Sequence, residues 1–96
     1  MLVSIVIPCY NSEHTIGKVV ELAIEEFDKL KDYECEFVLV NDYSRDGTWN
    51  AIHALAEKHP NVKGINLAKN FGQHNAIMAA MNHTEGDLII GMDDDM

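Results

Sequence analysis

The chain has 96 residues, of which 47% are hydrophobic and 24% are charged, and its net charge at pH 7 is −9. This composition is ordinary for one small globular domain and excludes a disordered chain. Its 7 lysines and arginines are scattered rather than gathered into a basic stripe, so we expect no nucleic-acid partner. No apolar run approaches the roughly 18 residues of a membrane-spanning helix.

The first part of the sequence predicts two buried strands with a helix between them. Residues 2–8 read LVSIVIP, a β-branched run typical of a buried parallel strand. Apolar residues then recur at helical spacing over residues 16–30, which predicts a long amphipathic helix capped by Ser12 or Thr15. Residues 36–40, EFVLV, predict the second buried strand.

The middle of the sequence predicts a loop, a helix and a third strand. Residues 41–48, NDYSRDGT, are rich in turn formers, and either Ser44 or Asp46 can cap the helix that follows. Pro60 ends this helix, and residues 62–67 predict a weaker strand.

The last part predicts a turn, a helix and a fourth strand. Residues 70–72 form the turn, residues 73–83 are rich in alanine and methionine and predict a helix, and residues 87–92 predict the strand. Strands and helices therefore alternate along the whole chain. This alternation predicts a mostly parallel four-stranded sheet with helices on both faces.

The two cysteines, Cys9 and Cys35, lie in or beside apolar runs and have no metal-binding spacing. We expect both to be small, buried, free thiols. The 5 histidines also lack paired ligand spacing such as HExxH.

Polar segments follow each predicted strand. In a parallel sheet all the carboxyl ends lie along one edge, and ligands bind there. The segments at that edge are residues 9–13 (CYNSE), 41–44 (NDYS), 68–72 (AKNFG) and 93–95 (DDD). Because carboxylates, amides and aromatic rings gather there, this edge is the candidate site.

The acidic triplet is the most informative of these segments. Three adjacent carboxylates repel one another and are tolerable at a strand end that holds a divalent cation and an anionic ligand. If the strand continues, Asp93 and Asp95 point the same way and Asp94 points the other. Carboxylate oxygens suit Mg²⁺ or Mn²⁺ better than zinc. With Asp42 as an acceptor for a base and Tyr10 as a flat face, the pattern predicts a nucleoside diphosphate ligand.

Plainer interpretations of the same residues stay open. The triplet can be a solvated chain end, Asp42 a turn cap, and Glu13 a carboxylate favoured by the helix dipole. Tyr10 can pack over the sheet edge, and Asn70 can satisfy its own turn. A receiver-like phosphoryl-transfer domain or a non-catalytic nucleotide-binding module is the alternative function. The sequence has neither GxxxxGK[ST] nor GxGxxG, which leaves metal neutralisation as the device for binding a diphosphate.

Four segments in this order resemble the amino-terminal half of a family 2 glycosyltransferase with the GT-A fold. They are VSIVIPCYNSE (3–13), FVLVNDYSRDGT (37–48), LAKNFGQHNAIMAAM (67–81) and GDLIIGMDDDM (86–96). The stretch NFGQHNAIMAA and the ending DDDM are most similar to the branch that uses polyprenyl-phosphate acceptors, as dolichyl-phosphate mannose synthases do. The resemblance implies a three-layer, Rossmann-like α/β half domain over residues 1–96 that binds a nucleotide sugar and is truncated at its Asp-x-Asp motif.

The resemblance also implies roles for individual residues. Asp42 would bind the edge of the uracil or guanine ring, and Asp93 and Asp95 would hold Mg²⁺ or Mn²⁺ against the diphosphate. The residues implied in contact with the nucleotide sugar are Pro8, Tyr10, Glu13, Asp42, Asn70, Gly72 and Asp93. Tyr43 departs from the pattern, because glycine is usual there, and we expect the loop to follow another path.

The implied activity is transfer of a sugar from a UDP- or GDP-linked donor to a lipid phosphate or a saccharide. An inverting mechanism would place the catalytic base and the acceptor site downstream, so we expect this chain to be an inactive fragment. The resemblance further implies a cytoplasmic protein, working at the inner face of the membrane through residues outside this sequence. A half domain exposes surface that the rest would cover, and we expect it to self-associate.

Overall fold

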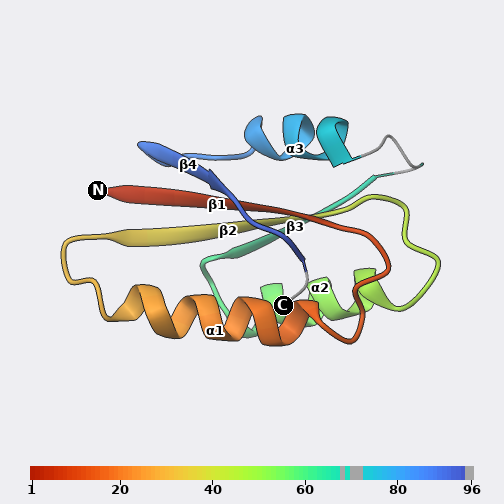
Figure 1. Ribbon diagram of the computed structural model, residues 1–96, viewed down its shortest axis with the longest axis horizontal. Coiled ribbons are helices and arrows are strands. Elements are labelled where there is room, and N and C mark those ends of the chain that lie inside the picture. Colours follow the sequence, from red (N-terminus) through yellow and green to blue (C-terminus); the bar gives the residue numbers. More distant parts are fainter. Residues whose placement is uncertain (68, 70–72, 95–96) are drawn as a thin grey trace.

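The computed structural model describes residues 1–67, 69 and 73–94. Within them, strands and helices alternate along the chain and form a sheet covered by helices (Figure 1). The strands are β1 (Leu2–Cys9), β2 (Glu34–Asn41), β3 (Val62–Asn66) and β4 (Leu88–Gly91). The helices are α1 (Ile16–Asp28), α2 (Thr48–Lys58) and α3 (Gln73–Met81). Every predicted element is therefore present and of the predicted type.

The four strands form one sheet in the order β3-β2-β1-β4, and every neighbouring pair is parallel. β1 and β2 are paired from Leu2 opposite Glu34 to Cys9 opposite Asn41. β4 is an edge strand that pairs with β1 alone, through Leu88–Gly91. The chain moves outward from β1 to β3 and then returns to the other side of β1. This reversal is a topological switch point, where open α/β sheets bind ligands beyond the carboxyl ends of their strands.

Side chains of the two central strands alternate between two hydrophobic layers. Ile5, Ile7 and Phe37 face the layer that α1 and α2 cover, whereas Val6 and Val38 face the layer under α3. Figure 1 shows the same arrangement, with α1 and α2 below the sheet and α3 above it. The predicted three-layer α/β architecture with helices on both faces is confirmed.

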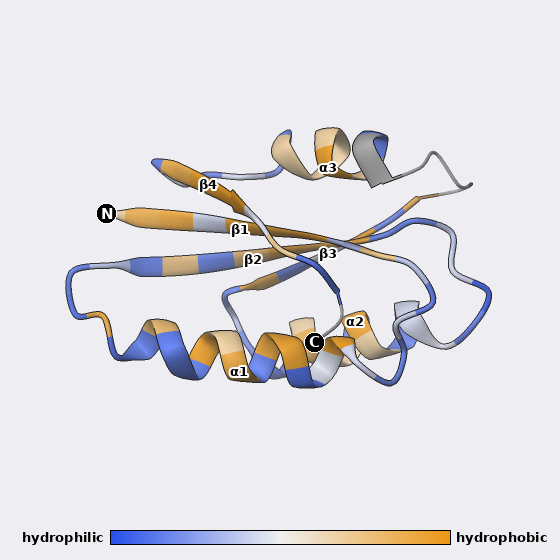
Figure 2. Cartoon of the chain, viewed as in Figure 1, coloured by the Kyte–Doolittle hydropathy of each residue, from blue (hydrophilic) through white to orange (hydrophobic). Residues whose placement is uncertain are grey.

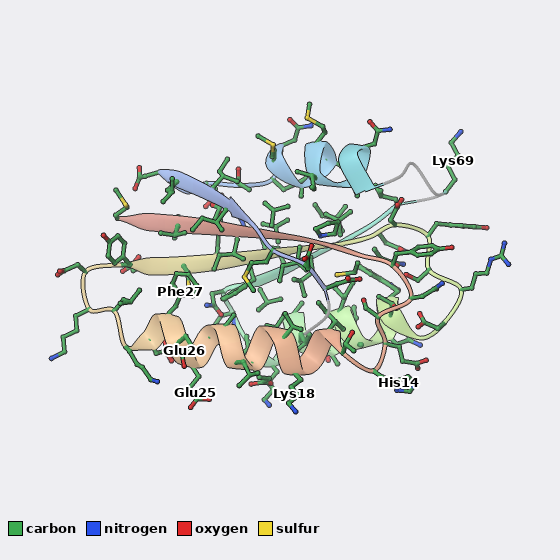
Figure 3. All side chains as sticks on the ribbon, viewed as in Figure 1. His14, Lys18, Glu25, Glu26, Phe27 and Lys69 are labelled. Atoms are coloured by element: carbon green, nitrogen blue, oxygen red, sulfur yellow. The ribbon has the colours of Figure 1, made fainter. Side chains whose placement is uncertain are left out.

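Helix α1 carries a polar outer face and an apolar inner face, as its periodicity predicts (Figure 2). Lys18 and Glu25 point away from the sheet, and Phe27 points toward it (Figure 3). There Phe27 meets Phe37 edge to face, with ring centroids 6.5 Å apart. The helix ends at Asp28 rather than at residue 30, and Leu30 is 47% exposed.

The cysteines and the helices can be compared with what the sequence predicts. Both cysteines are free; Cys9 is buried and Cys35 is half-buried. None of the helices in the described ranges has the length and apolar character needed to cross a membrane. The β4 residues Leu88, Ile89 and Ile90 are 38–48% exposed, so this apolar strand is an open edge of the sheet.

Candidate functional site

The loops that follow β1 and β2 begin side by side at the carboxyl edge of the sheet. The Asp42 N–H donates to the carbonyl of Cys9 at 2.9 Å, which continues the pairing of the two strands by one residue. Tyr10 and Asp42 therefore start adjacent loops. The Asp42 side chain is almost fully buried at 4% exposure, whereas Tyr10 is 48% exposed.

A set of hydrogen bonds clasps these two loops together. The Asn11 N–H donates to Ser44 Oγ at 3.0 Å, and the Arg45 N–H donates to Asn11 Oδ1 at 3.0 Å. The Ser12 N–H donates to Thr48 Oγ1 at 2.8 Å. Each bond joins a backbone group of one loop to a side chain of the other, so the loops hold one shape as a unit.

The Asp46 carboxylate is the centre of this clasp. It accepts hydrogen bonds from the Thr48 N–H at 3.0 Å, from the Thr48 hydroxyl and from the Glu13 N–H at 3.3 Å. Partial desolvation acts to raise the pKa of Asp46, but these bonds to the charged form outweigh it, and the pKa lies below its ordinary value. Of the two predicted caps for α2, Asp46 is the one that accepts a first-turn N–H, while Ser44 binds Asn11.

Neither predicted cap for α1 acts through its side chain. Thr15 occupies the N-cap position but makes no capping hydrogen bond. Instead, the backbone carbonyl of Ser12 accepts the N–H groups of Thr15 and Ile16 at 3.1 and 2.9 Å. The Thr15 hydroxyl is directed to the end of β4, as described below.

Two residues in the clasp have a left-handed backbone. Asn11 has φ of 50° and Tyr43 has φ of 57°. Asparagine adopts this conformation readily, but tyrosine pays a steric penalty for it. The expectation that Tyr43 would send the loop along another path is wrong: the tyrosine keeps the glycine-like backbone, because hydrogen bonds at Ser44 hold the residue that follows.

Asn41 uses both ends of its side-chain amide. Its Nδ2 donates to Asn66 Oδ1 at 2.8 Å, and its Oδ1 accepts the Ser44 N–H at 3.1 Å. These bonds connect the carboxyl ends of β2 and β3 to the loop that contains Asp42. An aspartate, which has no donor when ionised, could not make the first bond.

Asp93 and Asp94 lie beyond the end of β4. The Met92 N–H still donates to the carbonyl of Val6 at 3.0 Å, but the strand itself ends at Gly91. Strand alternation therefore does not extend to these two aspartates. Asp93 is exposed, and Asp94 is half-buried. The Asp94 Oδ2 accepts the Tyr10 N–H at 2.9 Å, and its carbonyl accepts the Thr15 hydroxyl at 2.9 Å.

The remaining predicted residues differ in how they lie. Pro8 is buried at the end of β1. The Glu13 carboxylate is directed to the β2–α2 loop and fills the space beside Gly47. It also lies 3.7 Å from the ring of the neighbouring His14. Asn70, Gly72 and Asp95 lie outside the described residues. Lys69 projects from the segment after β3, toward the same end of the molecule as the first two loops (Figure 3).

The Cys9 thiol lies beneath this edge and is unreactive as a nucleophile. Burial, followed by the nearby charge of Asp94, raises the pKa of Cys9 to about 12. Its Sγ lies 3.3 Å from the carbonyl of Ile7. The thiol is therefore neutral at physiological pH and serves as a packing group.

The described part of the site brings Tyr10, Asp42 and Asp93–Asp94 to one edge. No group of three or more His, Cys, Asp or Glu side chains able to hold a metal ion occurs among residues 1–67, 69 and 73–94. Asp93 is exposed and offers the hard oxygen atoms that Mg²⁺ and Mn²⁺ take. The donor chemistry thus fits a hard divalent cation that has few protein ligands.

Sequence reasoning missed the residues that shape the site without facing a ligand. Asn11, Thr48 and Asp94 each accept a backbone N–H from a partner distant in sequence. An asparagine beside a turn and a threonine at a helix start are signals for local capping, but neither indicates the distant partner.

The fold and its edge define the class of protein. A parallel sheet with a switch point between β1 and β4, and polar loops at the carboxyl ends of those strands, is typical of open α/β domains, which bind ligands at that edge. The model of glycosyl transferase family 2 matches residues 4–96. The chain belongs to this family.

Relatives and solved structures agree with that assignment. An undecaprenyl-phosphate 4-deoxy-4-formamido-L-arabinose transferase of Shewanella sediminis is 47% identical over 96 residues, which are 98% of this chain and 28% of that protein. A bactoprenol glucosyl transferase of Shigella phage SfX is 40% identical over 96 residues, 100% of this chain and 31% of that protein. The mannosyltransferase of Pyrobaculum calidifontis, solved with GDP-Man and Mn²⁺, has a TM-score of 0.84 at 29% identity over 97% of this chain and 27% of its own. The chain thus spans less than a third of the length of these proteins.

Proposed function

We propose that this chain binds a nucleotide-diphosphate sugar at the carboxyl edge of its sheet. The observation that carries the proposal is the meeting of Tyr10 and the acidic segment across the switch point, through the 2.9 Å bond from the Tyr10 N–H to Asp94. A ligand at the switch point would contact the loops after β1 and β2 and the aspartates after β4 at the same time. The GDP-Man held by a protein of the same fold supports this ligand class.

Within this site, each predicted residue has a proposed role. Asp42 would bind the base, which is uracil or guanine, and the exposed ring of Tyr10 would lie against the base or ribose. Pro8 and Glu13 would complete the pocket at its β1 side. Asn70 and Gly72 would shape the side that faces the ribose and sugar.

We further propose that Asp93 and Asp95 hold Mg²⁺ or Mn²⁺. The oxygen donors and the exposure of Asp93 fit either ion, and the solved relative with Mn²⁺ supports a divalent metal. A bound ion would neutralise the diphosphate and stabilise it as a leaving group. The protein would supply the position of the two carboxylates and of the base-binding loops.

For the whole protein we propose transfer of the sugar, with inversion, to a polyprenyl phosphate. The undecaprenyl-phosphate and bactoprenol transferases among its relatives support a lipid phosphate over a saccharide acceptor. Such an acceptor would place the protein at the cytoplasmic face of a membrane. We place the catalytic base outside these 96 residues, as the resemblance to inverting members of the family implies.

The alternative functions have less support. A receiver-like domain gathers acidic residues after its first strand, where this chain has Cys9 and Tyr10. A non-catalytic nucleotide-binding module would have the same edge but no transferase relatives. The family match over residues 4–96 favours the transferase.

Calorimetry of the chain with UDP and with GDP, each with and without Mn²⁺, tests donor binding. We expect one nucleotide to bind, and binding to weaken strongly when the metal is chelated or when Asp93 is replaced by Asn. Lys31→Ala, far from the edge, is the control. Equal binding with and without metal would refute the metal site, and no binding of either nucleotide would refute the donor site.

Two further measurements test the remaining proposals. Incubating the chain with a nucleotide sugar and a polyprenyl phosphate should give no glycolipid product, and measurable product would overturn the proposed inactivity. Sedimentation of the chain should show self-association through the open apolar edge at Leu88, Ile89 and Ile90. A monomer at high concentration would contradict it.

A further inference from the structure

β4 is held against β1 at both of its ends by an aspartate. At the amino end, Asp87 Oδ2 accepts the Leu2 N–H at 3.1 Å. At the carboxyl end, Asp94 Oδ2 accepts the Tyr10 N–H at 2.9 Å. Among the described residues β4 pairs with β1 alone, so these two anchors act together with the short ladder to β1 and the bonds at Glu85 and Gly86 to hold the strand in place.

Asp94 is tied to the β1–α1 loop at two points. Its carboxylate takes the Tyr10 N–H, and its backbone carbonyl takes the hydroxyl of Thr15 at the start of α1. Figure 1 shows the segment after β4 crossing in front of β1 and running toward the start of α1. Asp94 therefore holds the β1–α1 loop at its start, through Tyr10, and at its end, through Thr15.

Asp94 and Asp93 differ in their surroundings. Asp93 is exposed, while Asp94 is half-buried and its charge acts on the buried thiol of Cys9. A carboxylate that accepts a backbone N–H makes a short, strong, charge-assisted bond.

We propose that Asp94 is a positioning residue, which anchors the acidic segment to the β1–α1 loop so that the neighbouring, exposed Asp93 presents its carboxylate to the cation. This inference rests on the proposed function, and it separates the aspartate that anchors the segment from the aspartate that would bind the metal. It also couples the two halves of the donor site, because the N–H that Asp94 takes belongs to Tyr10.

Two substitutions separate anchoring from metal ligation. Asp94→Asn keeps an oxygen that can accept the Tyr10 N–H but removes the negative charge, so it is a much weaker ligand for a divalent cation. Asp94→Ala removes both. A residue that orients metal ligands changes metal affinity by about 10- to 100-fold when it is lost.

The experiment measures Mn²⁺ affinity by the electron paramagnetic resonance signal of free Mn²⁺, in the presence of UDP or GDP. We expect Asp94→Ala to weaken Mn²⁺ binding about 10-fold or more, and Asp94→Asn to stay within about 3-fold of the parent chain. Asp93→Asn should remove the metal site. The exchange rate of the Tyr10 amide proton should rise in Asp94→Ala and stay low in Asp94→Asn.

Asp87→Ala is the matched control. It deletes the equivalent bond at the far end of the same strand, so it should lower stability to a similar degree and leave Mn²⁺ affinity unchanged. Equal loss in Asp94→Asn and Asp94→Ala would make Asp94 a ligand and overturn the inference. Unchanged Mn²⁺ affinity in Asp94→Ala would do the same, by leaving Asp94 a purely structural role. A parent chain that binds neither nucleotide would instead overturn the proposed function.

Discussion

The Lys63 ammonium on β3 lies 3.0 Å from the Glu36 carboxylate on β2, and that carboxylate is 8% exposed. The other oxygen of Glu36 accepts the Ser4 hydroxyl of β1 at 2.5 Å and the Glu85 N–H at 2.6 Å. One buried carboxylate thus joins three strands to the turn that leads into β4. It lies at the amino end of the sheet, opposite the candidate site.

Replacing Glu36 with Ala should destabilise the fold. The substitution leaves the Ser4 hydroxyl and the Glu85 N–H without an acceptor, which costs about 2–3 kcal/mol of unfolding free energy. Lys63 is 42% exposed, so water hydrates its ammonium when Glu36 is absent, and loss of this ion pair adds little to the change in unfolding free energy. Urea denaturation measures the change. Glu36→Gln, which keeps one acceptor, should lose less, and equal losses would show that the bonds to Glu36 do not carry the effect.

The same carboxylate makes stability depend on pH. Desolvation acts to raise the pKa of Glu36, but bonds from Glu85, Ser4 and Lys63 outweigh it and bring the pKa below the ordinary 4.5. A pKa that is lower in the folded state stabilises the fold above pH 4.5, and this contribution is lost as the pH falls through the folded value. The parent chain should therefore lose unfolding free energy below pH 4.5 faster than Glu36→Gln does. Parallel pH profiles would contradict this.

Gly86 lies where no side chain fits. A Cβ there would come within 2.3 Å of Ser4 Oγ, 2.7 Å of the Ser4 nitrogen and 3.1 Å of the Leu2 carbonyl. Since two of these atoms are backbone, Gly86→Ala should lower the unfolding free energy by about 1–3 kcal/mol. Gly17→Ala is its matched opposite, because nothing lies within 4 Å of that position in α1. It should raise stability by about 0.5–1 kcal/mol, and a loss at Gly17 would show that the Gly86 effect is not steric.

Local sequence patterns predicted the strands, but they could not predict contacts between residues far apart in the chain. The runs at 2–8 and 36–40 predicted β1 and β2 because a buried parallel strand is itself a continuous apolar, β-branched run. Glu36 was read as part of such a run, since its partners Ser4 and Glu85 lie 32 and 49 residues away. Hydrogen bonds of that reach depend on topology, which local patterns do not contain.

In the candidate site, too, some features could be predicted from the sequence and others could not. The predicted parallel sheet alone placed Tyr10, Asp42 and Asp93 at one edge, because parallel strands share a carboxyl end. The orientation of Asp94 could not be predicted, because β4 stops at Gly91 and strand alternation stops with it. The backbone of Tyr43 was predicted wrongly, since the clasp overrides the steric preference of a single residue.

Tyr43→Gly should stabilise the fold. The left-handed backbone at φ of 57° costs a tyrosine about 1–2 kcal/mol, and glycine avoids this while losing about 0.5–1 kcal/mol to chain entropy. We expect a net gain of about 0.5–1 kcal/mol in thermal or urea unfolding. Tyr10→Gly is the control, since Tyr10 has similar exposure but no positive φ, and it should destabilise. Loss of stability in both variants would show that the Tyr43 ring contributes more than its backbone costs.

Thr48 holds the clasp between the first two loops, and its loss should loosen both. Thr48 is fully buried, its Oγ1 accepts the Ser12 N–H at 2.8 Å, and its hydroxyl proton goes to Asp46. Thr48→Val keeps the shape but leaves the Ser12 N–H unsatisfied, which should cost about 1–3 kcal/mol. It should also raise the pKa of Asp46 toward its ordinary value, because one of the bonds that lower that pKa is gone. Denaturation and an NMR titration of Asp46 measure the two effects. Thr48→Ser, which keeps the hydroxyl, should leave the pKa of Asp46 low, and an unchanged low pKa in Thr48→Val would show that the Thr48 hydroxyl does not lower it.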